Sequence, residues 1–306
     1  MKICNFDDWE IWDGASEGTG RSEKEWLRSA EGQVGLFKYP KSNETTEYIS
    51  EHLAYKLGVL LEVPTAKIDI GTRNNRLGSM SYQINKEKEA IIEGVNFIIG
   101  AHPLFNSDTL FDDESGMYYC MEFIFHSFNY NPEIRKFLIQ MMMFDFLIGN
   151  SDRHQNNWAV LFRYDRGSTV VGELDICPLY DNGSSLCCYE SEASVEDYLK
   201  TRDLLKFNAL VDSKSISLIR IDGNRKKKPT HRKVIEHLIN KYDYAKDVGY
   251  RFLKRLDDDT IRLLVDEYPD EIISFNRKQL IIKYLIRKRD ILQEVLDEQY
   301  TTEKEK

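Results

Sequence analysis

The sequence predicts an α+β protein of two unequal lobes, a small mixed lobe over residues 1–84 and a larger, mainly helical lobe over residues 85–306. Two observations support this division. Short apolar stretches between glycines, prolines and turn residues, which are typical of strands, dominate the first lobe. Longer segments with apolar residues at helical spacing dominate the second lobe. With 306 residues, the chain is long enough to bury a core in both lobes.

Three strands are expected in the first lobe. The segment GQVGLFKYP (32–40) predicts a strand centred on Val34 to Tyr39, because glycines precede it and a proline follows it. Two more strands are predicted over residues 63–71 and 76–84, with the letters TRNN forming the turn between them. Together these strands predict a small sheet.

A helix is expected after the first of these strands. Ser42 or Asn43 can cap its start, acidic residues fill its first turn, and Gly58 is expected to end it. Within residues 41–58, apolar side chains recur at helical spacing at Ile49, Leu53 and Leu57. The helix therefore has one face that can pack against the sheet or against the second lobe.

The second lobe is expected to consist of long helices around one hairpin. A helix is predicted over residues 132–149, since the letters NPE at its start combine a capping residue with a proline in the first turn. Between this helix and the C-terminal region, WAVLFRYD (158–165) and GELDICPLYD (172–181) alternate as a hairpin does. The C-terminal helix is amphipathic, with an apolar face of Ile281, Leu285, Leu292 and Leu296. The segment GNSDRHQNNW (149–158) thus lies in a loop between a buried helix and a strand, a common place for catalytic residues.

The composition narrows the class of function. A net charge of −9 argues against a nucleic-acid-binding protein, which needs a basic surface, and against binding to a membrane surface. The five cysteines are odd in number and lack metal-ligand spacing, so the reduced thiols of a cytoplasmic protein are expected. The N-terminus has no apolar signal segment, and Asp145 interrupts the longest apolar run, so no membrane insertion is expected.

Three polar residues around the hairpin have the spacing of a magnesium-dependent phosphoryl-transfer site. Asp152 and Asn157 stand five positions apart in the loop, and Asp181 follows the hairpin in the letters DNG. The oxygens of Asp181 and Asn157 are hard ligands of the kind that Mg²⁺ prefers. The carboxylate of Asp152 then remains free to orient a hydroxyl and accept its proton. This spacing alone is weak evidence, because turn-capping residues of a solvated loop share it.

Lys38 and Glu51 strengthen the interpretation. Lys38 is a lone lysine in the apolar strand, and Glu51 lies on the helix that follows. In kinases, a strand lysine contacts the nucleotide phosphates and pairs with a helix glutamate. Glu47, one turn earlier on the same face, is the alternative partner. A solvated edge-strand lysine would explain Lys38 alone, but the full set of polar groups in this order favours a phosphate site.

The motif set resembles one known family. LIGNSDRHQNNWAVL followed by PLYDNGSSL resembles the HipA-like serine/threonine kinases, in particular their short, stand-alone bacterial members. The helix letters SEHLAYKLG and the strand letters LFKYP match that family in place and order, so the resemblance runs from about residue 13 to residue 190. It implies a bilobal protein-kinase-like fold with ATP and Mg²⁺ between the lobes.

The resemblance also implies a role for each matched residue. Asp152 would be the catalytic base, and Asn157 and Asp181 would be the Mg²⁺ ligands. Lys38, with its helix glutamate, would contact the ATP phosphates, and His154 would lie at the nucleotide. The adenine is expected at the end of the first lobe.

The adenine contact is assigned by position. The stretch SMSYQI (79–84) ends the first lobe, as a hinge between two lobes should. Backbone groups near Met80 and Tyr82 are therefore expected to bind the adenine ring.

A glycine-rich segment is the expected cover of the phosphates. Gly18 and Gly20 lie in DGASEGTGRSEKEW (13–26), where the absence of side chains lets backbone groups approach a phosphate; a flexible surface loop is the alternative explanation. Some family members phosphorylate a serine in this segment and switch themselves off. Ser22 or Ser16 is therefore a candidate regulatory site, since a phosphate there would bring about two negative charges to the ATP site.

The sequence therefore predicts an ATP- and Mg²⁺-dependent protein kinase that phosphorylates Ser or Thr of a protein substrate. Three further properties are left open: autophosphorylation, a toxin-like role, and a small antitoxin or regulator as partner. A phosphoinositide-type lipid kinase is the second interpretation, because DRHQNN also resembles the catalytic loop of that class; the basic run NRKKKPTHRK (224–233) would have to face the lipid. A pseudokinase that binds nucleotide without transfer is the third. No direct nucleic-acid binding is expected.

Overall fold

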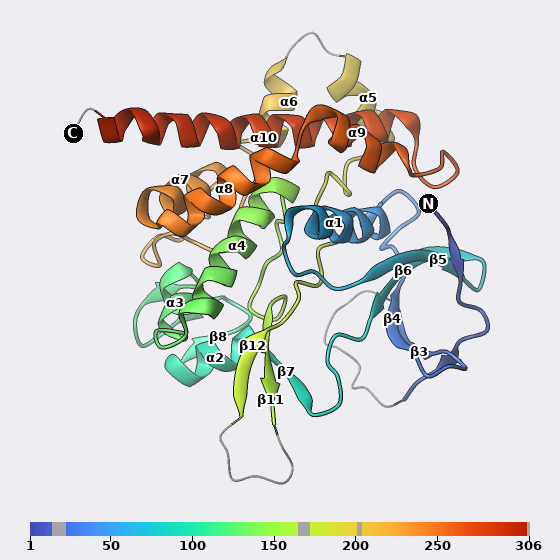
Figure 1. Ribbon diagram of the computed structural model, residues 1–306, viewed down its shortest axis with the longest axis horizontal. Coiled ribbons are helices and arrows are strands. Elements are labelled where there is room, and N and C mark those ends of the chain that lie inside the picture. The colour runs from blue at the N-terminus through green and yellow to red at the C-terminus, as the bar shows by residue number, and fades with distance from the viewer. Residues whose placement is uncertain (14–22, 165–171, 201–203, 305–306) are drawn as a thin grey trace.

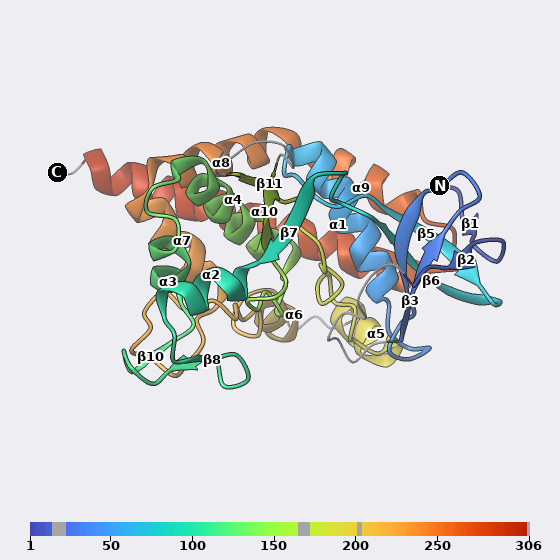
Figure 2. The same ribbon diagram turned by 90° about the horizontal axis from the view of Figure 1, so that it is seen from below.

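The computed structural model describes residues 1–13, 23–164, 172–200 and 204–304. A curved sheet lies at one end of the molecule, and a larger, mainly helical part lies at the other (Figure 1; Figure 2 shows the same division from below). The predicted α+β class, with a small sheet-containing part and a larger helical part, is confirmed. Within the described residues, no helix combines the length and the apolar character needed to cross a membrane.

The small part is built on a six-stranded sheet. Its order is β1-β5-β6-β4-β3-β2, and every neighbouring pair is antiparallel except β1 and β5. The strands are β1 (Cys4–Asn5), β2 (Glu10–Ile11), β3 (Lys24–Arg28), β4 (Val34–Lys38), β5 (Ile68–Arg73) and β6 (Arg76–Tyr82). The three predicted strands are present as β4, β5 and β6. The predicted turn joins β5 to β6 through Asn74 and Asn75, whose φ angles of 51° and 60° are those a two-residue hairpin turn requires.

Helix α1 (Glu47–Leu61) is present, but both of its predicted ends are wrong. It begins after Thr46, and it ends when Glu62 adopts a left-handed conformation with φ of 57°. Gly58 lies inside the helix, where a Cβ atom would come within 2.3 Å of the Thr65 side chain. The glycine is therefore explained by the close approach of the chain at Thr65 and not by helix termination.

Helix α1 lies between the two parts of the molecule. It packs against β5 and β6 and also against α8 (Asp243–Arg255) and α9 (Asp258–Asp266). Its buried residues, including Ile49, Leu53 and Leu57, belong to the large apolar core, whereas the sheet has a smaller core of its own around Phe37 and Met80. The buried polar side chains of this helix, Ser50, Glu51 and His52, are thus held between the sheet and the helices.

Two three-stranded sheets lie beyond β6. One has the order β12-β11-β7 and contains the predicted hairpin, and the other has the order β10-β9-β8. Their strands are β7 (Glu89–Glu93), β8 (Phe105–Asn106), β9 (Phe111–Asp112), β10 (Met117–Tyr118), β11 (Ala159–Arg163) and β12 (Glu173–Ile176). The hairpin positions the two chain segments that precede and follow it, residues 149–158 and 177–184.

Helices make up most of the larger part. They are α2 (Gly94–Ala101), α3 (Met121–His126), α4 (Pro132–Ile148), α5 (Glu192–Lys200), α6 (Leu204–Val211), α7 (His231–Lys241), α8 (Asp243–Arg255), α9 (Asp258–Asp266) and α10 (Phe275–Lys304). Helix α4 begins as predicted, since the Asn131 side chain accepts a hydrogen bond from the Ile134 backbone and Pro132 follows it. Every residue of α4 from Phe137 to Ile148 is buried, and α7, α8 and α10 pack against it. The helix is a rigid support for the loop that follows.

Gly149 ends α4 and allows a test of this support. Its φ is +68°, and a Cβ atom there would lie 2.0 Å from the Tyr284 hydroxyl oxygen. We expect Gly149→Ala to lower the free energy of unfolding by about 2–5 kcal/mol, since left-handed strain and a clash in a packed interior add together.

Gly116 is the matched control, because it has the same φ of +68° but no atom within 4 Å of the added Cβ. Gly116→Ala should cost only the strain, about 1–2 kcal/mol. Urea denaturation of both variants measures the difference; equal losses would contradict the packing of Tyr284 on Gly149.

Candidate active site

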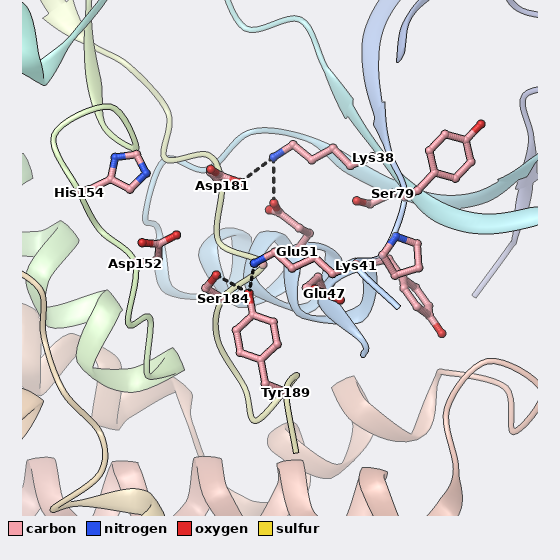
Figure 3. Close-up of a pocket in the computed structure, with 14 residues that line it drawn as sticks. Lys38, Lys41, Glu47, Glu51, Ser79, Asp152, His154, Asp181, Ser184 and Tyr189 are labelled. Carbon is pink, nitrogen blue, oxygen red and sulfur yellow. Dashed lines mark hydrogen bonds and ion pairs between the residues drawn. The ribbon is translucent and has the colours of Figure 1, made fainter. Parts of the chain in front are cut away.

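One cavity brings together five of the residues that the sequence singles out, Lys38, Glu51, Asp152, His154 and Asp181. Its volume is about 350 Å³, and it lies where β4 and α1 face the loops on either side of the hairpin (Figure 3). It is lined by Lys38, Tyr39, Pro40, Lys41, Glu47, Tyr48, Glu51, Ser79, Asp152, His154, Asp181, Gly183, Ser184 and Tyr189. Residues 143 positions apart, Lys38 and Asp181, thus meet in one place.

Lys38 connects the sheet, α1 and the segment after the hairpin. Its Nζ lies 3.2 Å from Glu51 Oε1 and 2.8 Å from Asp181 Oδ1. The helix partner is therefore Glu51 and not the alternative, Glu47. The second oxygen of Glu51 accepts a hydrogen bond of 3.0 Å from the Asn182 backbone N–H, so the same carboxylate orients both the lysine and the residue after Asp181.

The ion pair decides the charge states of Lys38 and Asp181. Burial alone would lower the pKa of Lys38, but the charges of Asp181 and Glu51 outweigh it and leave that pKa raised. The charge of Lys38 in turn lowers the pKa of Asp181 to about 2. Both groups are therefore ionised at neutral pH, and Asp181 keeps 43% of its side chain exposed, so a cation can reach it.

Asp152 is held by its backbone while its carboxylate stays free. Its N–H donates to Asn150 Oδ1 at 3.0 Å, and its carbonyl accepts from Asn157 Nδ2 at 2.8 Å. Its carboxylate makes no hydrogen bond to another described residue, and Figure 3 shows it beside His154 at the cavity. Burial raises the pKa of Asp152, and the negative charge of Asp181 adds to this effect. A partly buried carboxylate with a raised pKa and no internal partner is suited to accept a proton.

Arg153 fixes this geometry from inside the protein. Its guanidinium is buried and pairs with Asp145 of α4 at 2.8 Å. It also donates to the carbonyl oxygens of Asn157 (2.5 Å) and Tyr180 (2.9 Å) and to Asn182 Oδ1 (2.6 Å). One side chain therefore ties the loop with Asp152 to the segment that carries Asp181. No motif in the sequence points to Arg153. The signal that could have found it is Asp145, a charge within a buried helix, which requires a partner.

The other two residues of the loop occupy different places. His154 lines the cavity, and its Nδ1 lies 3.2 Å from the Asn156 backbone N–H, which indicates that Nε2 carries the proton. Asn157 is buried and does not line the cavity. Because its Nδ2 is bonded to the Asp152 carbonyl, Oδ1 is the atom available to a ligand.

The expected adenine contacts, Met80 and Tyr82, lie in the sheet of the small part. Strand β6 lies between β5 and β4, so residues 79–81 pair with a neighbouring strand on both sides. The Tyr82 N–H donates to the Lys67 carbonyl at 3.1 Å, and the Met80 side chain is fully buried. Neither Met80 nor Tyr82 lines the cavity. Their expected contact with adenine stays a prediction.

The glycine-rich segment cannot be compared with the prediction. Gly18, Gly20, Ser16 and Ser22 lie outside the residues that the structure describes. Their expected roles in covering phosphates and in regulation stay predictions.

Lys41, Ser184 and Tyr189 are cavity residues that the sequence analysis missed. Lys41 Nζ lies 2.8 Å from the Tyr189 hydroxyl, which lies 2.8 Å from Ser184 Oγ (Figure 3). Glu47 also lines the cavity, and both of its carboxylate oxygens are buried without a hydrogen-bond partner among the described residues. No motif marks these residues, although Lys41 follows Lys38 in the letters KYPK.

The donor set fits Mg²⁺ better than a transition metal. Among the described residues, there is no group of three or more His, Cys, Asp and Glu side chains that could hold a metal by itself. Asp181 offers hard oxygen atoms at the cavity, and an ion bound by so few protein ligands needs phosphate oxygens and water to complete its coordination. This is the usual binding mode of Mg²⁺ with a nucleotide.

Comparisons with known proteins agree with this geometry. No protein-family model matches the chain. In sequence, 147 residues are 29% identical to the serine/threonine-protein kinase CtkA of Helicobacter pylori (strain J99). That match covers 45% of this chain and 39% of the length of the curated relative. It supports a kinase.

The fold comparison covers nearly the whole chain. The crystal structure of the Helicobacter pylori proinflammatory kinase CtkA has a TM-score of 0.79 at 19% identity, over 97% of this chain and 99% of that chain. HipA of Shewanella oneidensis MR-1 was solved in a toxin–antitoxin complex with HipB and operator DNA. Its TM-score is 0.55 at 15% identity, over 94% of this chain and 69% of that chain. The chain therefore has the fold of the Helicobacter pylori kinase, and its resemblance to the HipA-like serine/threonine kinases is confirmed.

Proposed function

We propose that the protein is an ATP- and Mg²⁺-dependent kinase that transfers the γ-phosphoryl group to Ser or Thr hydroxyls of a protein substrate. The observation that carries the proposal is the meeting of Lys38, Glu51 and Asp181 within hydrogen-bond distance, on the same cavity as the unpartnered carboxylate of Asp152. The sequence similarity to a serine/threonine-protein kinase supports it.

The charge of the cavity supports a requirement for a cation. Its lining contains four carboxylates, Glu47, Glu51, Asp152 and Asp181, but two lysines, Lys38 and Lys41. A polyanionic nucleotide would be repelled by this excess of negative charge. We therefore expect ATP to bind together with Mg²⁺, which would neutralise charge on the phosphates while held by Asp181 and Asn157.

The chain's own residues then have distinct tasks. Lys38, oriented by Glu51, holds a phosphate oxygen and stabilises the negative charge that builds on the transferred group. Asp152 aligns the substrate hydroxyl and accepts its proton as the new P–O bond forms, while the bond between the γ-phosphorus and the β–γ bridging oxygen breaks and ADP leaves. His154 donates from Nε2 to the nucleotide. The adenine contact through backbone groups near Met80, Ser81 and Tyr82 stays a prediction.

Location and partners are part of the proposal. We expect the protein to act in the cytoplasm, since its five cysteines are free thiols. A small antitoxin-like regulator, as in the complex of HipA with HipB, and phosphorylation of Ser22 or Ser16 stay predictions. Mass spectrometry of the protein made with and without an intact Asp152 would detect a phosphate on either serine.

The test offers labelled ATP to the purified chain with a casein-like protein, with phosphoinositide vesicles, and with neither, each with Mg²⁺ and with EDTA. Label on Ser or Thr of protein, lost with EDTA, is the expected result. Label on lipid alone would favour the lipid-kinase interpretation. Stabilisation by ATP and Mg²⁺ in a thermal-shift assay, without transfer to any acceptor, would favour the pseudokinase and overturn the proposal.

A further inference from the structure

A chain of buried hydrogen bonds connects the C-terminal helix to the 149–158 loop. Lys288 Nζ of α10 lies 2.8 Å from Ser215 Oγ. Ser215 Oγ lies 3.0 Å from His231 Nδ1, at the first position of α7. His231 Nε2 lies 2.9 Å from the backbone carbonyl oxygen of Asn150. Lys288, His231 and Asn150 are each 1% exposed, so water does not compete for these bonds.

Each bond in this chain has a defined direction. The Asn150 carbonyl can only accept, so His231 Nε2 must carry a proton and donate it. Burial and the nearby Lys288 lower the pKa of His231 to about 3, so the ring is neutral at ordinary pH and Nδ1 is an acceptor. The Ser215 hydroxyl therefore donates to Nδ1, and Ser215 Oγ accepts from Lys288. Reversing any one bond would leave another group unsatisfied.

The series of hydrogen bonds ends at Asn150, two residues before Asp152 in the sequence. Asn150 uses its side-chain oxygen to accept the Asp152 N–H at 3.0 Å, and its Nδ2 donates to Asp145 Oδ1 at 3.2 Å. Asn150 is thus held by His231 on its carbonyl and by Asp145 on its amide, and it holds the Asp152 backbone in turn. A displacement of Asn150 would move the carboxylate of Asp152.

We propose that His231, Ser215 and Lys288 form a positioning relay that fixes the 149–158 loop and, through it, aims Asp152 into the cavity. None of the three lines that cavity, so they act through Asn150 and not on the nucleotide. Buried polar groups are costly unless all are paired, and a fully paired network specifies one arrangement of the parts that it joins. The catalytic part of this proposal rests on the proposed kinase function, whereas the ordering of the loop does not.

The test compares three variants of α7. His231→Leu removes the bonds to Asn150 and Ser215. His231→Gln keeps a donor near the position of Nε2. Val234→Ala, on the buried face of the same helix, loses packing but leaves the relay intact. For each we would measure kcat, KM for ATP, the thermal midpoint, and hydrogen exchange at the backbone amides of residues 151–157.

His231→Leu should lower kcat by about tenfold to a hundredfold, the range for a small misplacement of a catalytic group. Its KM for ATP should rise by less than kcat falls, because Lys38, Glu51 and Asp181 lie outside the 149–158 loop and keep their contacts. Exchange of the loop amides should accelerate, and His231→Gln should recover most of both changes. Val234→Ala should lower the thermal midpoint and leave kcat and loop exchange as in the wild type.

Two results would overturn the relay: wild-type kcat and exchange in His231→Leu, or equal changes in Val234→Ala. The exchange measurement also separates the two proposals. If the wild type transfers no phosphate, the proposed function fails, but accelerated loop exchange in His231→Leu alone would still support the relay.

Discussion

Replacement of Asp152 by alanine is expected to reduce phosphoryl transfer by about 10²–10⁴, the usual contribution of a positioned general base. Binding of ATP with Mg²⁺ should change little, because the Asp152 carboxylate makes no bond to Lys38, Glu51 or another described residue. The loop itself should persist, since the backbone bonds of Asp152 to Asn150 and Asn157 do not depend on its side chain. Steady-state kinetics and nucleotide titration of the same preparation would separate the two effects.

The isosteric Asp152→Asn and the exposed Asp113→Ala are the matched variants. Asp152→Asn keeps the shape but not the base, so it should lose transfer as Asp152→Ala does, and Asp113→Ala should lose none.

The activity of the wild type should also depend on pH. Burial raises the pKa of Asp152, and the base must be deprotonated to act. On acidification, activity should therefore begin to fall at a pH above the pKa of an ordinary aspartate. Near-full transfer by Asp152→Ala would show that another group accepts the proton.

Replacement of Asp181 by alanine is expected to abolish both Mg²⁺-dependent nucleotide binding and transfer. Asp181 is the accessible carboxylate of the cavity that is paired with Lys38, and its pKa of about 2 keeps it ionised across the working range. Without it, the expected metal site retains Asn157 alone, and Lys38 keeps only Glu51 as a partner. The thermal stabilisation that the wild type gains from ATP should then no longer increase with Mg²⁺ concentration.

Lys38→Met is the informative comparison for Asp181→Ala. It removes the phosphate contact but leaves the carboxylate of Asp181, so the response to Mg²⁺ in the presence of ATP should persist while transfer is lost. A Mg²⁺ titration at saturating ATP distinguishes the two variants. An unchanged response to Mg²⁺ in Asp181→Ala would mean that Asp181 serves Lys38 and not a metal.

The elements with strong local signals were predicted correctly. The turn at Asn74 and Asn75, the Asn131–Pro132 start of α4 and the apolar face of the C-terminal helix depend on neighbouring residues, and the structure confirms each. Gly58 shows the limit of this reasoning. In a sequence, a glycine is compatible both with the end of a helix and with the close approach of another residue. Only the packing of Thr65 against Gly58 shows that the second explanation applies.

The residues of the candidate site could likewise be predicted only in part from the sequence. Lys38, Asp152, Asn157 and Asp181 were identified because their order and spacing resemble a known motif set. The choice of Glu51 over Glu47 could not be made from the sequence, since both lie on one helical face. The central position of β6 in the sheet could not be predicted either, because the letters of a strand do not show whether it lies at the edge or in the centre.

The amino-acid sequence by itself determined the α+β class, the helix and strand types, and the polar residues that the chemistry needs, because these depend on patterns within a few turns or on a spaced motif. Tertiary structure alone decided which groups meet. The pairing of Arg153 with Asp145, the Lys41–Tyr189–Ser184 contact and the path from Lys288 to Asn150 join residues whose separation along the chain carries no sign of their contact. Hydrogen bonds and ion pairs depend on distances of a few ångströms, and those distances exist only after the helices and the sheet have packed.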